Sequence, residues 1–360
     1  MKLLFLTQNG QHGPSSRYRV YQLVPHLEKL GITCVVSPAI DDELYHSIYL
    51  SSDGRGGCRR TAFLETWRRR QADVARIQEF DAVFVQKGVF PGLYAGFERR
   101  LAARRPLVFD FDDTIWLPRE GGHPLLRTLH REGTVHEILR CATAVIAGNE
   151  FLAEYAQRFN PNVTVVPSSI DVARYRRSDD SVVIGWIGSR TTLPYLKPLA
   201  VVFKALSVKP RVIASGDPST LGFEVEFRPW RLETELDELA RIGIGIAPLP
   251  DTPWERGKCG VKLLQYMACG VPVVASPVGV QQQIIRDREN GLLARGEEEW
   301  HRHLTALMGD AGLRARLGAA ARKTVERHYD VRAAAGNVAN VLAASTQTNG
   351  ITGRLNRRSA

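Results

Sequence analysis

The stretch at residues 258–279 reads KCGVKLLQYMACGVPVVASPVG, and it decides the fold. It predicts a loop, then a helix, then a turn at Gly270 and Pro272 that leads into a buried strand. A helix joined to an apolar strand by so short a turn is typical of parallel sheets, because parallel strands need crossover helices between them. The stretch therefore predicts an α/β fold.

The same alternation runs through the chain in two successive series. Short apolar runs rich in Val, Ile and Phe are separated by segments of helical pattern. The expected strands are residues 3–6, 34–36, 82–85, 107–109 and 144–146 in the first series, and 182–187, 211–214, 243–248 and 272–275 in the second. Each series is long enough for a doubly wound parallel sheet of its own. The break falls in the polar stretch 168–180, SSIDVARYRRSDD.

Length and composition agree with two globular domains. The chain has 360 residues, of which 44% are hydrophobic and 24% charged. The net charge of +10 favours an anionic partner, although only nine of the 48 basic residues are lysines. Five scattered cysteines without a Cys-x-x-Cys pair favour a reducing cytoplasm. We expect neither a signal peptide nor a spanning helix, because no apolar run reaches about 18 residues.

Two lysines mark the start of the helix in the opening stretch. Gly257 to Val261 would leave free backbone amides at a helix N-terminus, which favours phosphate. Lys258 and Lys262 lie four apart there, where positive charge opposes the helix dipole unless an anion is bound. The alternative is that both side chains are simply solvated.

The stretch resembles the donor-binding motif of the group 1 glycosyltransferases, carbohydrate-active family 4. MACGVPVVAS matches closely, whereas the two motif glutamates are replaced by Gly257 and Gln265. The resemblance implies that Gln265 contacts the ribose of a sugar nucleotide and that Lys258 takes part of the role of the first glutamate. It also implies the GT-B fold, with two Rossmann-like domains facing each other across a cleft that holds the active site.

Other segments resemble the family in the expected order. VVIGWIGSRTTLPYL resembles the first strand and phosphate loop of the nucleotide-binding domain, with Gly188, Ser189 and Arg190 at the turn. FRPW resembles its base-recognition loop, which makes Trp230 a neighbour of the nucleobase. The amides of Gly260 and Val261 complete the expected donor site.

The resemblance also gives domain bounds. Residues 1–170 would form the acceptor domain and 171–329 the nucleotide-sugar domain. Three helices are expected from Glu297 onward; Asp330 would cap the last, which would cross back to the first domain over residues 330–345. Residues 346–360 are polar and predict a disordered tail.

In the first half, QNGQHGPSSRYRV follows the first strand and resembles the family's glycine-rich loop. Gly10 and Gly13 would face the donor diphosphate, although many turns show the same spacing. The expected acceptor-binding side chains are His12, Arg17, Arg19 and Lys87, and surface ion pairing is the alternative for the arginines. Lys87 ends a strand, where ligands of open parallel sheets bind.

The segment VFDFDDTIW, residues 108–116, allows three interpretations. Asp110, Asp112 and Thr114 have the D-x-D-x-T spacing of haloacid-dehalogenase-like phosphatases, and D-x-D also holds a divalent metal in GT-A glycosyltransferases. Within the GT-B interpretation, Asp112 and Asp113 polarise the acceptor hydroxyl, and Lys258 completes the catalytic set.

The resemblance implies a retaining hexosyltransferase that uses a UDP or GDP sugar and no metal or other cofactor. Basic side chains and a helix terminus would stabilise the departing diphosphate. The acceptor stays open between a glycan, a lipid-linked molecule and a small molecule, for polysaccharide or glycoconjugate synthesis. The loss of both glutamates also allows an inactive sugar-nucleotide-binding relative.

One basic segment indicates which partners the protein could bind. Seven arginines, at positions 55, 59, 60, 68, 69, 70 and 76, accompany Phe63, Trp67, Val74 and Ile77 at helical spacing. Such a helix can lie on an anionic membrane, which predicts peripheral contact at its inner face. The alternative is that the four apolar residues face the core and the arginines are solvated. No nucleic acid is expected as a partner.

Overall fold

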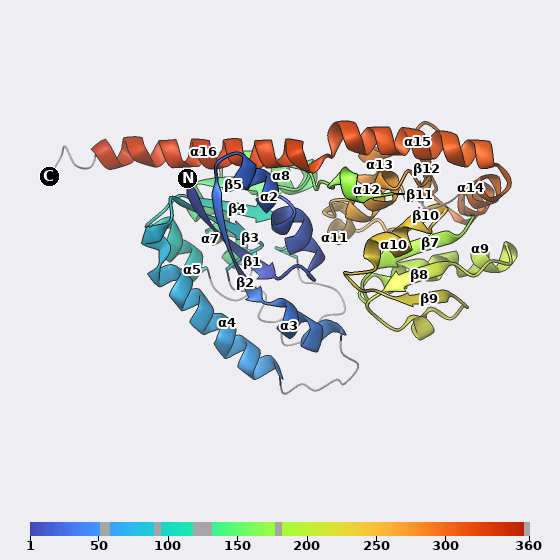
Figure 1. The fold of residues 1–360 in the computed structure, drawn as a ribbon, viewed down its shortest axis with the longest axis horizontal. Helices are drawn as coiled ribbons and strands as arrows, with labels where there is room; N and C mark the ends of the chain where they lie inside the picture. The colour runs from blue at the N-terminus through green and yellow to red at the C-terminus, as the bar shows by residue number, and fades with distance from the viewer. Residues whose placement is uncertain (51–57, 90–94, 118–131, 177–181, 356–360) are drawn as a thin grey trace. The chain divides into compact units, whose positions relative to one another are not determined.

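The computed structural model describes residues 1–50, 58–89, 95–117, 132–176 and 182–355, and divides into two compact units (Figure 1). The first unit contains Met1–Ser168, Gly257–Cys259 and Val331–Ala360, and the second contains Ser169–Arg256 and Gly260–Asp330. No helix within these described ranges is both long enough and apolar enough to cross a membrane.

The first unit is built on a six-stranded parallel sheet of order β2-β1-β3-β4-β5-β6. In register, Leu3 of β1 lies opposite Cys34 of β2 and Ala82 of β3. The strands are β1 (Lys2–Asn9), β2 (Thr33–Ile40), β3 (Ala82–Gln86), β4 (Leu107–Phe111), β5 (Ala144–Ala147) and β6 (Val163–Val165). All five predicted strands are present, because a sheet covered on both faces needs continuous apolar runs.

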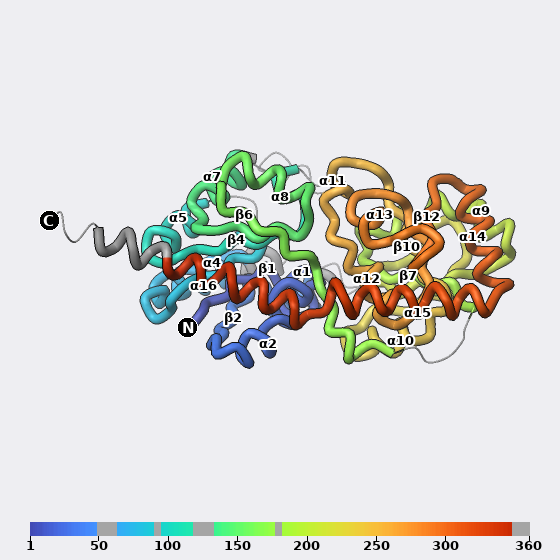
Figure 2. Tube along the Cα trace, turned by 90° about the horizontal axis from the view of Figure 1, so that it is seen from above, coloured from blue at the N-terminus to red at the C-terminus, as the bar shows by residue number. Residues whose placement is uncertain are grey.

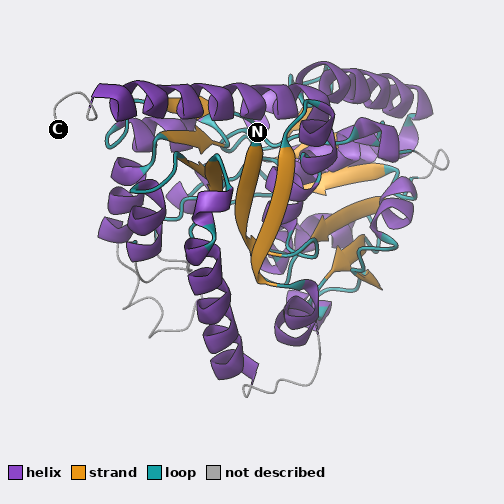
Figure 3. Cartoon of the chain, turned by 60° about the vertical axis from the view of Figure 1, so that its left-hand side comes forward, coloured by secondary structure: helices purple, strands orange, loops and turns teal. Residues whose placement is uncertain are grey.

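Helices cover both faces of this sheet (Figure 3). Leu4, Val83 and Phe109 face one layer, and Leu3 and Phe84 face the other, since successive side chains point to opposite sides. The helical segments before the last helix are α1 (Pro14–Ser16), η1 (Arg17–Tyr21), α2 (Val24–Lys29), α3 (Asp42–Tyr45), η2 (His46–Leu50), α4 (Cys58–Ala75), η3 (Ile77–Glu79), α5 (Gly96–Ala102), α7 (Glu132–Cys141) and α8 (Glu150–Gln157).

The last helix, α16 (Val331–Leu355), belongs to the first unit and lies along its sheet (Figure 2). Val331, Val338 and Leu342 pack in the same cluster as the Leu3 face. The helix continues to Leu355, where the sequence predicts a disordered tail from residue 346; residues 356–360 lie outside the described residues. Ser345 and Thr346 donate their hydroxyls to the carbonyls of Val341 and Leu342, which lets polar residues continue the helix.

The second unit holds another six-stranded parallel sheet, of order β12-β11-β10-β7-β8-β9. Its strands are β7 (Ile184–Gly188), β8 (Arg211–Ala214), β9 (Glu226–Pro229), β10 (Ile244–Ala247), β11 (Val273–Ala275) and β12 (Leu292–Leu293). The four predicted strands are present. β9, however, occupies residues expected to form a loop; it is a polar, largely exposed edge strand without an apolar run.

The helical segments of the second unit complete its two layers. They are η4 (Val172–Arg174), η5 (Leu193–Leu199), α9 (Ala200–Ala205), η6 (Pro218–Leu221), α10 (Glu235–Ala240), α11 (Pro253–Arg256), α12 (Val261–Ala268), α13 (Gln281–Ile284), α14 (Glu297–Gly309) and α15 (Ala311–His328). Gly245 of β10 allows close packing of α12, because a Cβ there would lie 2.6 Å from the Tyr266 ring. The three helices expected from Glu297 onward are α14, α15 and α16.

Candidate functional site

A buried ion pair lies at the end of β4. The guanidinium of Arg19, in η1, donates from Nε to both carboxylate oxygens of Asp110 at 3.2 Å, and from Nη1 to the carbonyl of Val166 at 2.7 Å. The Arg19 side chain is 3% exposed and that of Asp110 1%. Arg19 therefore cannot reach an acceptor, which corrects its predicted role. Asp110 cannot serve as a phosphatase nucleophile either, since Arg19 covers it.

Lys87 joins the next two aspartates. Its Nζ lies 2.8 Å from Asp112 Oδ1 and also binds Asp113 Oδ2. The hydroxyl of Ser15 donates to Asp112 Oδ1 at 2.5 Å. Burial would lower the pKa of Lys87, but the two carboxylates outweigh burial and hold this pKa above its ordinary value. The ammonium is thus a fixed positive charge beside both predicted catalytic aspartates.

The short segment Gly257–Cys259 also belongs to the first unit. Asn149 caps α8 through Leu152 N, and its Nδ2 donates to the Gly257 carbonyl at 3.0 Å and to the Lys258 carbonyl at 3.3 Å. Cys259 is buried in the first core, and its Sγ lies 3.4 Å from the Asp112 carbonyl oxygen. These contacts bring Lys258 Nζ to 4.0 Å from Asp113 Oδ1.

Exposure separates the residues of this cluster. The side chains of Lys87 and Asp112 are 8% and 9% exposed, whereas those of Asp113 and Lys258 are 28% and 26% exposed. Asp113 and Lys258 are therefore the groups that a substrate can reach. A carboxylate that accepts a proton or hydrogen bond and an ammonium that stabilises negative charge stand side by side there.

The glycine-rich loop after β1 is packed against its own unit. A Cβ at Gly10 would lie 2.3 Å from Asp42 Oδ1, and one at Gly13 would lie 2.4 Å from the Asn9 Cβ. Close packing thus explains both glycines without a ligand. His12, a predicted acceptor contact, donates its backbone N–H to Asp42 Oδ1 at 2.8 Å, and its Nδ1 lies 2.9 Å from the same oxygen.

The remaining basic candidate of this loop is Arg17. Its guanidinium lies 5.0 Å from the centre of the Tyr18 ring, on the half-exposed side of η1. Unlike Arg19, Arg17 is not enclosed by the core of the unit. It stays a candidate for contact with an anionic group.

In the second unit, the predicted phosphate loop follows β7. Ser189 N donates to Thr192 Oγ1 at 3.1 Å, and the Ser189 hydroxyl lies 2.9 Å from that of Thr191. Gly188 is required by packing, because a Cβ there would lie 2.3 Å from the Trp186 ring. Arg190 is exposed, and its backbone N–H donates to Ser215 Oγ at 3.4 Å. The loop thus presents hydroxyls and one exposed guanidinium at the carboxyl end of the sheet.

A carboxylate unites two of the predicted nucleoside contacts. Glu235 opens α10 and is 5% exposed; its Oε2 accepts from the Trp230 indole at 2.6 Å and its Oε1 from the Gln265 amide at 3.1 Å. Trp230, Gln265 and Glu235 therefore form one polar cluster. Glu235 escaped prediction, although the acidic first turn ETELDEL is a helix-start signal.

The start of α12 differs from the prediction. The helix begins at Val261, with Gly260 at its N-cap in the left-handed region, φ 69°. Lys258 consequently lies in the preceding loop and belongs to the first unit, while Lys262 belongs to the second. Lys262 Nζ lies 3.9 Å from the centre of the Trp186 ring, a cation–π contact. The two lysines do not share one helix terminus.

Glu255 is another buried carboxylate that the sequence did not point to. It lies in α11, is 6% exposed and accepts hydrogen bonds from the hydroxyls of Tyr195 and Thr252. It stands two residues before Gly257, where the family motif would have its first glutamate. The Tyr195 hydroxyl ties α11 to η5, whereas Thr252 lies directly before α11.

Only some side chains of the basic segment are exposed to solvent. On α4 the buried stripe is Thr66, Arg70 and Val74, continued by Ile77, so the predicted core residues Phe63 and Trp67 are instead 47% and 38% exposed. Arg70 is fully buried, which contradicts the prediction that the arginines are solvated. Arg55 lies outside the described residues, as do the side chains of Arg59 and Arg60.

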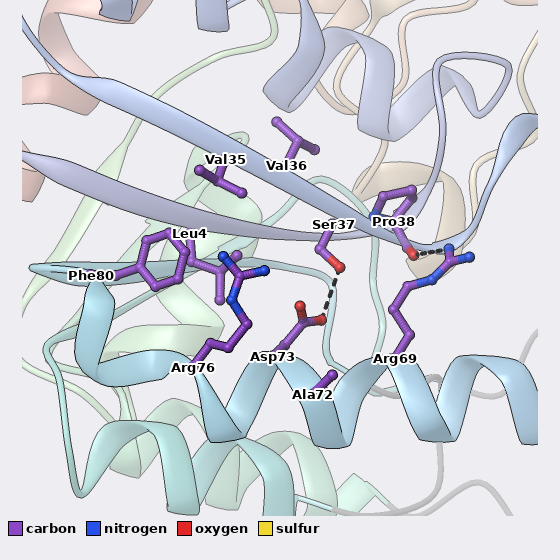
Figure 4. A pocket seen from close by; sticks show the side chains of 10 residues that line it. All are labelled: Leu4, Val35, Val36, Ser37, Pro38, Arg69, Ala72, Asp73, Arg76 and Phe80. Atoms are coloured by element: carbon purple, nitrogen blue, oxygen red, sulfur yellow. Dashed lines mark hydrogen bonds between the residues drawn. The ribbon is translucent and has the colours of Figure 1, made fainter.

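A cavity of about 370 Å³ lies between α4 and the edge of the first sheet (Figure 4). Arg69 donates to the Pro38 carbonyl at 2.8 Å, and Ser37 donates to Asp73 at 2.9 Å. The other lining residues are Leu4, Val35, Val36, Ala72, Arg76 and Phe80. This cavity contains none of the predicted site residues.

Comparison with known proteins agrees with the two-sheet architecture. Residues 229–324 match the family described as glycosyl transferases group 1. D-inositol 3-phosphate glycosyltransferase from Stackebrandtia nassauensis is 29% identical over 241 residues, 55% of this chain and 52% of the relative. The match thus spans about half the length of this curated relative.

Two solved structures share the fold over nearly the whole chain. HepE from Anabaena, in complex with UDP and glucose, has a TM-score of 0.70 and 17% identity over 96% of this chain and all of that one. Sucrose-phosphate synthase from Thermosynechococcus elongatus has a TM-score of 0.69 and 15% identity over 94% of this chain and 97% of that one. The two units therefore have the GT-B fold, and residues 229–324 match the group 1 glycosyltransferases.

Proposed function

We propose that the protein transfers a sugar from a nucleoside-diphosphate sugar to an acceptor hydroxyl. The observation that carries this proposal is the family match over residues 229–324, which includes Trp230, Lys262 and Gln265. The second unit would bind the donor, with the base and ribose at the Trp230, Glu235 and Gln265 cluster. The diphosphate would bind Ser189, Arg190, Lys262 and the amides at Gly260 and Val261.

The chemistry of the donor half follows from charge. Cleavage of the bond between the sugar and the diphosphate leaves extra negative charge on the departing oxygen, which must be stabilised as it forms. Lys262 is held over an aromatic ring, and Arg190 is exposed at the strand end. Together with the amides that begin α12, these groups would supply that stabilisation.

In the first unit, Asp113 is the proposed partner of the acceptor hydroxyl. It is exposed enough to accept a hydrogen bond from that hydroxyl, and Lys87 holds its other oxygen in place. Lys258 would stabilise charge beside it, and Asp112 would position Lys87. Arg17 is the proposed contact for an anionic group of the acceptor.

The direct test is thermal unfolding in the presence of UDP, GDP, UDP-glucose and GDP-mannose. A ligand that binds only the folded state raises the free energy of unfolding by about 2.7 kcal/mol when its concentration is about a hundred times Kd. The midpoint of thermal unfolding rises accordingly. We expect one diphosphate to stabilise the protein, and Lys262→Ala to weaken binding of the diphosphate more than that of the nucleoside. If none of the four stabilises the protein, the proposed function is wrong.

We further propose transfer with retention at the anomeric carbon, a hexose donor and no metal requirement. The family resemblance supports the first two, and the basic side chains of Lys262, Lys258 and Arg190 support the third. The anomeric configuration of the product, read from the proton coupling of its anomeric carbon by NMR, tests retention. An inverted product would overturn that part of the proposal and leave the transferase activity standing.

We also propose that α4 contacts an anionic membrane surface at the cytoplasmic side. Phe63, Leu64 and Trp67 are 47%, 54% and 38% exposed along one part of the helix, with exposed Arg68 beside them. Sedimentation with anionic vesicles should fall in a variant with Ser at all three apolar positions. Val201→Ser, which alters an apolar residue 60% exposed in the second unit, is the matched control. Equal sedimentation of the two variants would contradict the contact.

A further inference from the structure

The backbone of Val89, just beyond β3, is held at its N–H and at its carbonyl by two buried charged side chains. Glu98 of α5 accepts the Val89 N–H at its Oε1 at 2.7 Å. Arg70 of α4 donates from its Nε to the Val89 carbonyl at 2.9 Å. Both charged residues are fully buried, so these bonds form away from water. Two helices therefore fix the backbone of one residue, on both sides of its Cα, just beyond a central strand.

Val89 closes a strained turn. Lys87 has φ 63° and Gly88 has φ 123°, and the left-handed region is costly for a lysine. Such a conformation persists only where the surroundings over-determine it. The backbone N–H of Lys87 still donates to the Asp110 carbonyl at 2.7 Å, so the strain begins where the strand ends. The turn aims the Lys87 ammonium at Asp112 and Asp113.

Arg70 connects this turn to the neighbouring strands. Its Nη2 donates to the Thr7 carbonyl of β1 at 2.7 Å, and its Nη1 donates to the Ser37 carbonyl of β2 at 2.9 Å. Asp73 balances its charge at 3.0 Å. The guanidinium therefore fixes Val89, which follows β3, relative to β1 and β2.

Only one carboxylate oxygen of Glu98 accepts the Val89 N–H. Its Oε2 is buried and has no hydrogen-bond partner among the described residues. Burial raises the pKa of Glu98 to about 7, although the Val89 N–H and the charge of Arg70 lower it. Cys141 of α7 is the other titratable group that faces it, and Asp73 faces it from beyond Arg70. Ionised Glu98 is the stronger acceptor for Val89 N–H.

We propose that Glu98 and Arg70 are positioning residues that set the Lys87 ammonium on Asp112 and Asp113, and that protonation of Glu98 loosens this arrangement. The role of Lys87 beside the acceptor rests on the proposed function, whereas its dependence on Glu98 does not. The inference therefore has one test without substrate and one with it.

The first test measures how fast each lysine reacts with a trace of acetic anhydride, read by mass spectrometry. Lys87 should react about ten-fold faster in Glu98→Ala than in the wild type, because loss of the Val89 bond frees the turn. Glu98→Gln keeps an acceptor oxygen but no charge, as protonated Glu98 does, and should give an intermediate increase of about three-fold at pH 8. Lys209, in the second unit and 67% exposed, is the internal standard.

A matched control separates this effect from general loosening of the unit. Thr66→Ala removes another buried hydrogen bond of α4, from Thr66 Oγ1 to the Ala39 carbonyl at 2.8 Å, without touching Val89. It should leave Lys87 unchanged. Should Glu98→Ala fail to fold, Glu98→Asp, which is one methylene too short for Val89, replaces it. Equal Lys87 reactivity in a folded Glu98 variant and the wild type overturns the proposal.

The second test measures UDP release from UDP-glucose between pH 6 and pH 8. The ratio of wild-type to Glu98→Gln rates should rise at least about three-fold over this range, with a midpoint near 7, because only the wild type ionises there. KM for UDP-glucose should stay constant while kcat changes. A constant ratio overturns the role of protonation. Absence of UDP release from every variant would count against the proposed function, while lysine reactivity would still decide the positioning role.

Discussion

Asp110 and Arg19 place opposite charges where neither meets water. The Asp110 carboxylate and the Val166 carbonyl accept most of the hydrogen bonds that the Arg19 guanidinium can donate. Removal of either charge would leave the other buried without a counter-charge. The neighbouring aspartates differ in kind. Asp112 is nearly enclosed, whereas Asp113 is open to a substrate. Three acidic residues in one short segment thus have three different tasks.

Asp110→Asn should lower the free energy of unfolding by about 3 to 5 kcal/mol, because it leaves the Arg19 charge buried and uncompensated. Urea denaturation measures the loss. Glu137→Gln, which breaks an ion pair with Arg99 whose side chains are 50% and 55% exposed, should change stability by less than about 0.5 kcal/mol. Unchanged stability of Asp110→Asn, combined with loss of magnesium-dependent phosphate release, would instead favour the phosphatase interpretation.

Glu235 gives the second residue-scale prediction. If this carboxylate binds the ribose hydroxyls, Glu235→Gln should weaken UDP binding about ten-fold, or about 1.4 kcal/mol, and leave 2′,3′-dideoxy-UDP unaffected. Adding Gln265→Glu should restore binding, since it returns a carboxylate to the same cluster. Isothermal titration calorimetry measures the binding of both nucleotides to the wild type, to Glu235→Gln and to the double variant. An equal loss for both nucleotides would assign Glu235 to the fold alone.

Among the elements, α16 shows how the distant end of the chain completes the first unit. Its apolar stripe covers the sheet face that Leu3, Phe5 and Phe84 present, beside α2. Among the side chains that the structure describes, which end at residue 347, the last buried ones are those of Leu342 and Ser345.

Truncation within α16 should therefore have a sharp threshold. A chain ending at residue 347 should unfold at the same temperature as the full chain, because it keeps Leu342 and Ser345. Leu342→Ala should cost about 2 to 5 kcal/mol, since it opens a cavity in a fully buried position. Thermal unfolding of the truncated chain and of Leu342→Ala, each compared with the full chain, measures the two effects. A large loss on truncation at 347 would mean that the terminal turns stabilise the unit in a way the packing does not account for.

At the scale of the molecule, the metal requirement can be tested independently of every single residue. We expect UDP release from UDP-glucose to continue after treatment with EDTA, because fixed cations would neutralise the departing diphosphate. Added magnesium should change the rate by less than about two-fold. Loss of activity with EDTA and recovery with magnesium or manganese would contradict the proposal of metal-independent transfer.

The two sheets could be predicted because buried parallel strands are written as local apolar runs. The edge strand β9 could not, since its exposed residues carry no such run. Contacts across long separations were likewise hidden. Arg19 and Asp110 lie 91 residues apart, and Glu98 in GFERRLA looks like an ordinary charged helix residue. The sequence predicts Lys258 at the N-terminus of the helix, but the helix begins three residues after it, and Lys258 belongs to the first unit.

The division of the chain has a consequence for its synthesis on the ribosome. Val331 to Leu342 and Cys259 are part of the core of the first unit, although they are translated long after its strands. Domains generally fold as units in the order of synthesis, but this unit must wait for the end of the chain. The second unit, which needs residues only up to Asp330, can therefore complete its core first.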